Sequence, residues 1–273
     1  MRALPDILRV SAAEVTAFKA ELALWVLTAT LPLIQLALWT AVAEEGPVAG
    51  FDQGDLARYF VATLLVRQLT ASWLVWSLNF EIRSGTLSQR LLKPVHPLWQ
   101  YGVQMVLAMP IRMAVLLPVI VPILWWKPEL WRTPAPLELL AFVVSVSLAW
   151  LLTFLVQAII AIAAFWIDKT DAFMNLWFAV WMVASGYSAP MAMLPPEVDA
   201  VLRWLPFRAT LGAPVEILAG SRFTAEEAGY DESARHAGIA FDLGLQAAWT
   251  AILLAVVAWA WRRGVARYGA FGA

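Results

Sequence analysis

Six long apolar segments divide this chain and constrain its fold more than any other feature. Each is about as long as the roughly 20 residues that a helix needs to cross the hydrocarbon core of a bilayer. Only 14% of the residues are charged, whereas about a quarter are charged in a typical soluble domain. The sequence therefore predicts an all-α membrane protein, one transmembrane domain with six transmembrane helices. The predicted spans are residues 22–43, 57–80, 101–125, 137–167, 172–193 and 241–261.

The spans differ in regularity. The first, second, fourth and sixth read as uninterrupted helices, whereas Pro110, Pro118 and Pro122 predict a kinked or broken third span. The fifth span leads into a connection, residues 194–240, whose first half is apolar. We expect this half to form re-entrant helices that dip back into the membrane.

The chain ends suggest an orientation. Residues 1–20 mix charged and apolar positions and predict an amphipathic helix at the membrane interface, with a short cytosolic lead-in helix as the alternative. Lys and Arg outside the spans number ten on the side of the two termini and seven on the other. Because positive charge favours the cytosol, both termini are predicted to be cytosolic.

Several classes of function find no support in the residues. A net charge of −1 offers no basic face for nucleic acid. The absence of cysteine excludes thiolate metal sites and cysteine nucleophiles, and two separated histidines suggest no metal cluster. No nucleotide-binding loop or hydrolase motif occurs. We therefore expect no catalytic residues, no metal and no cofactor in this chain.

The polar stretch between the second and third spans is the most informative segment. Gly85 breaks a helix and Pro94 ends the next, which predicts a short surface helix over residues 87–92. Its apolar side would dock into a groove on a partner, while nearby charges would contact that partner. An ordinary interfacial loop with snorkelling charges is the alternative. The residues concerned are Glu81, Arg83, Gly85, Thr86, Leu87, Arg90, Leu91 and Leu92.

The order of several motifs resembles the permeases of ABC transporters of the type 2 exporter class. They are Glu81-Ile82-Arg83-Ser84-Gly85-Thr86-Leu87, Leu91-Leu92-Lys93-Pro94-Val95-His96-Pro97, Ser185-Gly186-Tyr187, Trp204-Leu205-Pro206-Phe207-Arg208, residues 214–220 and Trp261-Arg262-Arg263-Gly264. An acidic segment at residues 226–232 departs from the pattern, and its role is unassigned.

The resemblance implies a specific assembly. The helix near residues 81–94 would be the coupling helix, which contacts a separate ATPase subunit present in two copies. ATP and Mg would bind that ATPase, and a second permease, identical or related, would complete the complex. The location implied is the cytoplasmic (inner) membrane of a bacterium. A hydrophobic or amphipathic substrate would be exported.

Two arginines interrupt the spans. Arg67, beside Gln68, lies near the middle of the second span, and Arg112 near the middle of the third. A charge there costs about 2.5–3.5 kcal/mol on insertion scales, so it faces protein or water. Either these residues line a polar path or hold an anionic lipid or substrate headgroup, or they tie to a backbone carbonyl or to a polar group such as Gln104 or Gln157. Trp73 and Trp76 are either interface anchors or part of a substrate path.

Two other functions stay open on the sequence alone. A membrane-embedded lipid-modifying enzyme would need convergent acids, bases or metal ligands, and arginine is a poor general base. A passive channel or a structural membrane subunit would need no ATPase. Turnover or ion conductance by the purified chain alone would favour one of these alternatives.

Overall fold

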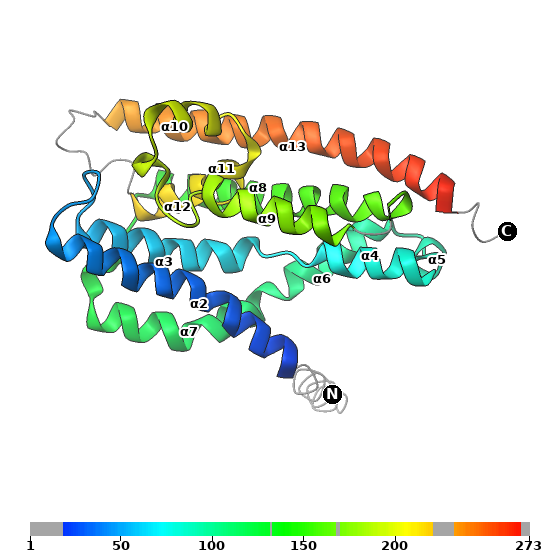
Figure 1. Cartoon of the computed structure of the whole chain (residues 1–273), viewed down its shortest axis with the longest axis horizontal. Coiled ribbons are helices and arrows are strands. Elements are labelled where there is room, and N and C mark those ends of the chain that lie inside the picture. The colour runs from blue at the N-terminus through cyan, green and yellow to red at the C-terminus, as the bar shows by residue number, and fades with distance from the viewer. Residues whose placement is uncertain (1–18, 132, 168–169, 221–231, 269–273) are drawn as a thin grey trace.

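The chain is a bundle of helices that run lengthwise beside one another (Figure 1). The computed structural model describes residues 19–131, 133–167, 170–220 and 232–268. In these ranges the structure is helical apart from turns and one isolated β-bridge between Val48 and Phe51. The α-helices are α2 (Lys19–Val42), α3 (Gln53–Thr70), α4 (Leu74–Ser84), α5 (Leu87–Leu91), α6 (Pro97–Leu107), α7 (Met109–Trp126), α8 (Pro136–Ile162), α9 (Asp171–Ala184), α10 (Pro196–Leu202), α11 (Pro206–Thr210), α12 (Gly212–Ala219) and α13 (Glu232–Tyr268). Short 3₁₀ turns are η1 (Ala43–Glu45), η2 (Pro128–Leu130), η3 (Ala163–Phe165) and η4 (Met191–Met193).

Four helical segments of the described chain are long and apolar enough to cross a membrane. They are Gln53–Ser84, Pro97–Trp126, Pro136–Phe165 and Arg235–Tyr268. They contain the second, third and sixth predicted spans and all but the last two residues of the fourth, so the chain is a multi-pass membrane protein. The first predicted span lies in α2, with 24 residues, and the fifth begins in the shorter apolar helix α9, with 14. The total of six spans stays a prediction.

The second span is not the uninterrupted helix that the sequence predicts. Its helix stops at Thr70 and restarts at Leu74, and Ala71 between them is extended, with φ −61° and ψ 134°. No proline or glycine lies at residues 69–73 to mark the break. Contacts from other helices therefore sustain it.

The third span is broken, in line with its prolines. α6 ends at Leu107 and α7 begins at Met109, one residue before Pro110, which has no N–H for the preceding turn. Pro118 and Pro122 lie inside α7 without ending it.

The fifth span is shorter than predicted, because α9 ends at Ala184 rather than near residue 193. Gly186 has φ +85°, and a Cβ there would lie 2.6 Å from the Tyr59 hydroxyl oxygen. That hydroxyl donates to the Gly186 carbonyl at 2.6 Å and fixes the turn against α3. At 1.5 Å per residue, α9 covers about 21 Å, less than the roughly 30 Å hydrocarbon core.

The buried core has two main parts. One lies where α4, α8 and α13 meet and includes Leu78, Leu152 and Val257. The other lies between α3, α9 and α12 and includes Tyr59, Trp181 and Val215. The outer faces of α7 and α13 leave large apolar side chains exposed, as lipid contact requires.

The two ends of the bundle carry different elements (Figure 1). α5 and the C-terminal end of α13 lie together at one end, whereas α10 to α12 lie toward the other. The predicted re-entrant connection does contain the short helices α10, α11 and α12. The predicted interfacial helix (residues 1–20) and the acidic segment (residues 226–232) lie outside the described residues, apart from 19–20 and from Glu232 at the start of α13.

Candidate functional site

The break in the second span is held open by side chains from two other helices. Arg112, on α7, donates to the Ala71 carbonyl at 2.6 Å and to the Met105 carbonyl at 2.9 Å. Gln157, on α8, donates to the Ser72 carbonyl at 2.9 Å. A membrane offers no water to such carbonyls, so protein donors must satisfy them. Both interruptions, in the second and the third span, therefore share Arg112 as a hydrogen-bond donor.

A hollow of about 790 Å³ opens beside this break. It brings together Arg67 and Gln68 from the end of α3 with Arg112 from α7, the three residues that the sequence singles out within spans. α8 and α9 complete the wall, together with Trp73 and Trp76 beside the break. The Arg67 guanidinium lies 5.3 Å from the centroid of the Trp181 ring. We call this hollow the α3–α4 cavity.

Sequence reasoning identifies the arginines because a charge stands out in an apolar run. It names Gln157 only as a possible tie for them, and it leaves Trp73 and Trp76 undecided between two roles. The break itself carries no local signal, so the role of Gln157 at the Ser72 carbonyl appears only in the structure.

The predicted surface helix corresponds to α5, which an ion pair ties to α4. The Arg90 guanidinium donates from Nε and an Nη to both carboxylate oxygens of Glu81, at 2.7 to 2.9 Å. It also lies over the Tyr101 ring, 4.2 Å from the ring centroid. The hydrogen bonds to Glu81 raise the pKa of Arg90 above its ordinary value, so this cation stays charged. These two residues thus satisfy each other.

The apolar side of α5 is divided between two roles. Leu87 has 0% exposure and packs into the chain's own core, with Leu91 partly buried beside it, whereas Leu92 is 87% exposed. Leu87 therefore cannot reach a partner directly, which corrects the expectation that all three leucines share one docking face. Arg83, Gly85 and Thr86 are exposed.

The turn before α5 is fixed from the far end of the chain. Gly85 has φ +77°, a left-handed conformation that favours glycine, and ends α4. The Tyr268 hydroxyl, in the last turn of α13, donates to the Gly85 carbonyl at 2.6 Å. Nothing local in the sequence indicates this contact across 183 positions.

A second buried arginine site lies on the other half of the bundle. Arg208, on α11, donates to both oxygens of Asp242 at 2.7 and 2.9 Å and to Glu216 at 2.7 Å. The three residues tie α11, α12 and α13 together, and we call them the Arg208 cluster. Sequence reasoning missed it because the carboxylates lie 8 and 34 residues away in helices whose packing was unknown.

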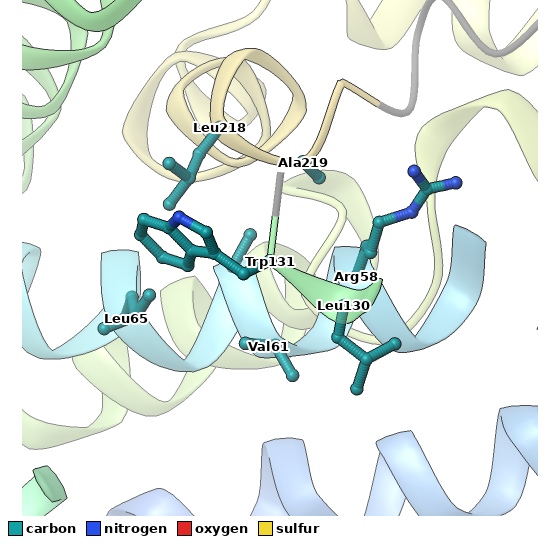
Figure 2. Close-up of a pocket in the computed structure, with 8 residues that line it drawn as sticks. Arg58, Val61, Leu65, Leu130, Trp131, Leu218 and Ala219 are labelled. Atoms are coloured by element: carbon teal, nitrogen blue, oxygen red, sulfur yellow. The ribbon is translucent and has the colours of Figure 1, made fainter. Parts of the chain in front are cut away.

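A smaller hollow of about 270 Å³ lies between α3, the η2 turn and α12 (Figure 2). Figure 2 shows the indole of Trp131 below Leu218, above the α3 side chains Val61 and Leu65. The one charged lining residue, Arg58, pairs with Asp55. This hollow is an apolar packing gap and lacks the polar convergence of the α3–α4 cavity.

Comparison with known proteins gives a family and no individual relative. No curated protein and no solved structure matches the chain. A family model described as ABC-2 family transporter protein matches residues 26–272, which include both the α5 segment and the α3–α4 cavity. The match covers nearly the whole chain, and the chain therefore belongs to the ABC-2 family of transporter membrane proteins.

Proposed function

We propose that the chain is the permease subunit of an ABC exporter for a hydrophobic or amphipathic substrate. A separate ATPase, in two copies, binds ATP and Mg and drives transport through α5. A second permease, identical or related, completes the complex. α5 and both termini face the cytosol of a bacterial cell, and the bundle spans its cytoplasmic membrane. The family match supports the transporter class, and the geometry of α5 supports the coupling role.

The observation that supports this proposal best is that α5 is firmly anchored on one side and is followed by an exposed apolar side chain, Leu92, at its C-terminal end. Leu87 is buried, Arg90 is paired with Glu81, and Tyr268 fixes the preceding turn. Leu92 projects 87% exposed from the same end of the bundle. If a docked partner displaces α5, these contacts would transmit the movement to the rest of the bundle while α5 stays folded.

We expect a displacement of α5 to move α4 first. The Glu81–Arg90 pair joins α5 to α4, and α4 is separated from α3 by the break at residues 71–73. Because the break interrupts the helix, α4 can tilt against α3 without bending a continuous ladder of hydrogen bonds. Movement of α5 would therefore change the shape of the α3–α4 cavity, which lies at that break.

Docking is tested by co-expressing the tagged chain with the genes that neighbour its own and by identifying any ATPase that it retains. Leu92→Asp is expected to reduce the retained ATPase by about tenfold or more, since it places a charge in an apolar contact. The yield of the chain itself should stay unchanged, because Leu92 is exposed. The readouts are co-purified ATPase and ATP hydrolysis in proteoliposomes.

Val201→Asp is the matched control, because Val201 is 62% exposed on α10, toward the opposite end of the bundle. It should retain the ATPase fully. Loss of the ATPase with both variants, or with neither, would contradict docking at α5. Chemical turnover or ion conductance by the chain without any ATPase would instead support the enzyme or channel alternative.

A further inference from the structure

The α3–α4 cavity carries an uncompensated positive charge. Arg67 and Arg112 both line it, so two guanidinium groups share one cavity. None of the cavity's lining residues is acidic, and no ion pair among the described residues includes either arginine. Burying two like charges together without a counter-ion is strongly unfavourable in an apolar medium. The missing partner is therefore an anion.

Two residues that line the cavity each have a buried hydrogen-bond donor without an acceptor. Arg112 is 2% exposed, and its Nε finds no acceptor even though both Nη atoms are bonded to carbonyls. The indole Nε1 of Trp73, beside the break, is likewise buried without an acceptor. Buried polar groups are nearly always hydrogen-bonded, so two unpaired donors at one cavity indicate an acceptor supplied from outside the chain.

The same cavity has an apolar side that reaches the outer surface. Trp76 on α4 and Phe178 on α9 line it and are 46% and 37% exposed. A ligand that enters between these helices would place an apolar part against the two rings while its head reaches the arginines. An anionic head on an apolar tail matches both halves of the lining.

We propose that the α3–α4 cavity binds the anionic headgroup, a phosphate or a carboxylate, of an amphiphile. Arg67 supplies charge, Arg112 supplies charge and its free Nε–H, and Trp73 donates from its indole. The tail lies along Trp76 and Phe178. A resident anionic lipid and an anionic amphipathic cargo share this chemistry. Headgroup binding involves this chain alone, so it can be tested independently of ATPase docking at α5.

The experiment measures lipid binding to the delipidated full chain in neutral detergent by native mass spectrometry. The probes are dioleoyl phosphatidylglycerol and dioleoyl phosphatidylcholine, which share their tails and differ in net charge. We expect the anionic lipid to bind about tenfold or more tightly than the zwitterionic lipid, as charge-assisted hydrogen bonds to one headgroup imply. Arg67→Gln should reduce that preference to near unity, and Trp73→Phe should reduce it partly.

Arg67→Gln is the decisive variant, because Arg112 also holds two backbone carbonyls and its removal can disturb folding. Arg203→Gln is the control, since it removes one positive charge from the C-cap of α10, at a residue that does not line the cavity. Equal binding by the Arg67→Gln variant and the wild type, or no preference in the wild type for an anionic probe, would overturn the proposal.

A single-chain competitor distinguishes the two sources of ligand. Dodecyl phosphate that displaces phosphatidylglycerol, and loses this ability in the Arg67→Gln variant, indicates a site open to amphiphilic cargo. Retention of phosphatidylglycerol against dodecyl phosphate indicates a resident lipid. Both outcomes support an anionic headgroup site, whereas binding of neither probe contradicts it.

Discussion

Two arginines in this protein are equally buried and differently paired. Arg208 and Arg112 are each 2% exposed. Arg208 faces two carboxylates, Asp242 and Glu216, whereas Arg112 donates only to neutral backbone carbonyls and lies near a second cation, Arg67. Burial alone therefore does not tell what a charged residue does. The Arg208 cluster neutralises its cation within the fold, and the α3–α4 cavity leaves positive charge for something outside it.

The largest effect is expected from Arg208→Leu. The change removes the cation that Asp242 and Glu216 share, and breaking a buried ion pair costs about 3–5 kcal/mol. The measurement is thermal unfolding of the detergent-solubilised chain. Arg203→Leu is the control, because its pair with Asp199 is only partly buried, with side chains 43% and 21% exposed, and is expected to contribute only about 1 kcal/mol. Similar losses for both variants would contradict the scaffold role of the Arg208 cluster.

Arg112→Leu is expected to cost about 2 kcal/mol. It leaves the Ala71 and Met105 carbonyls without donors, but it also removes a buried cation whose desolvation opposes folding. Gln157→Leu gives the neutral comparison at the same break, since it removes the donor to the Ser72 carbonyl without changing charge. Unfolding and protease cleavage near residues 71–73 measure the effect. No change with Arg112→Leu would mean that the break does not depend on this residue.

Arg67→Gln separates binding from stability. No carboxylate is left unpaired, because no ion pair among the described residues includes Arg67, and the change removes one of the two positive charges that line the cavity. We therefore expect the free energy of unfolding without lipid to change by about 1 kcal/mol or less. The stabilisation that added phosphatidylglycerol gives the wild type should disappear. A large loss of stability without lipid would assign Arg67 to the scaffold instead.

The smallest effect on stability is expected from the protonation of His96. This residue lies outside the spans, and its imidazole is a base that can gain or lose a proton. His96 is exposed, and partial desolvation of its imidazole lowers its pKa below the ordinary value of 6.5. A lowered pKa in the fold means that the stability associated with neutral His96 is present above pH 6.5 and is lost as the pH falls through the lowered pKa. His96 Nδ1 also accepts the Leu98 N–H at the start of α6, and protonation ends that contact.

Unfolding temperature measured across this pH window checks the His96 prediction. His96→Asn keeps an acceptor at the same cap and does not titrate, so its profile should be flatter than that of the wild type. Identical profiles would show that His96 does not contribute to the pH dependence.

The sequence predicts those features that depend on composition and local breakers. Apolar run length locates the membrane-spanning helices, and Pro110 signals the interruption between α6 and α7. Charge in an apolar run likewise draws attention to Arg67 and Arg112. The early end of α9 has partial signals in Gly186 and Pro190, but nothing local selects Ala184 as its last residue.

The features that the sequence does not reveal depend on tertiary contacts. The break at residues 71–73 contains no breaker residue and exists because Arg112 and Gln157 satisfy its carbonyls. The pairing of Arg208 with Asp242 joins residues 34 positions apart. The division of roles between Leu87 and Leu92 depends on how α5 packs on the core, which five helical residues do not specify.

The length of α13 has a mechanical consequence. Asp242 attaches the helix to Arg208, and Tyr268 attaches it to the turn before α5. At 1.5 Å per residue these two attachment points lie roughly 40 Å apart along one unbroken helix, farther than the hydrocarbon core is thick. Because an unbroken helix resists compression and stretching along its axis, α13 holds a fixed spacing between the Arg208 cluster and the turn before α5.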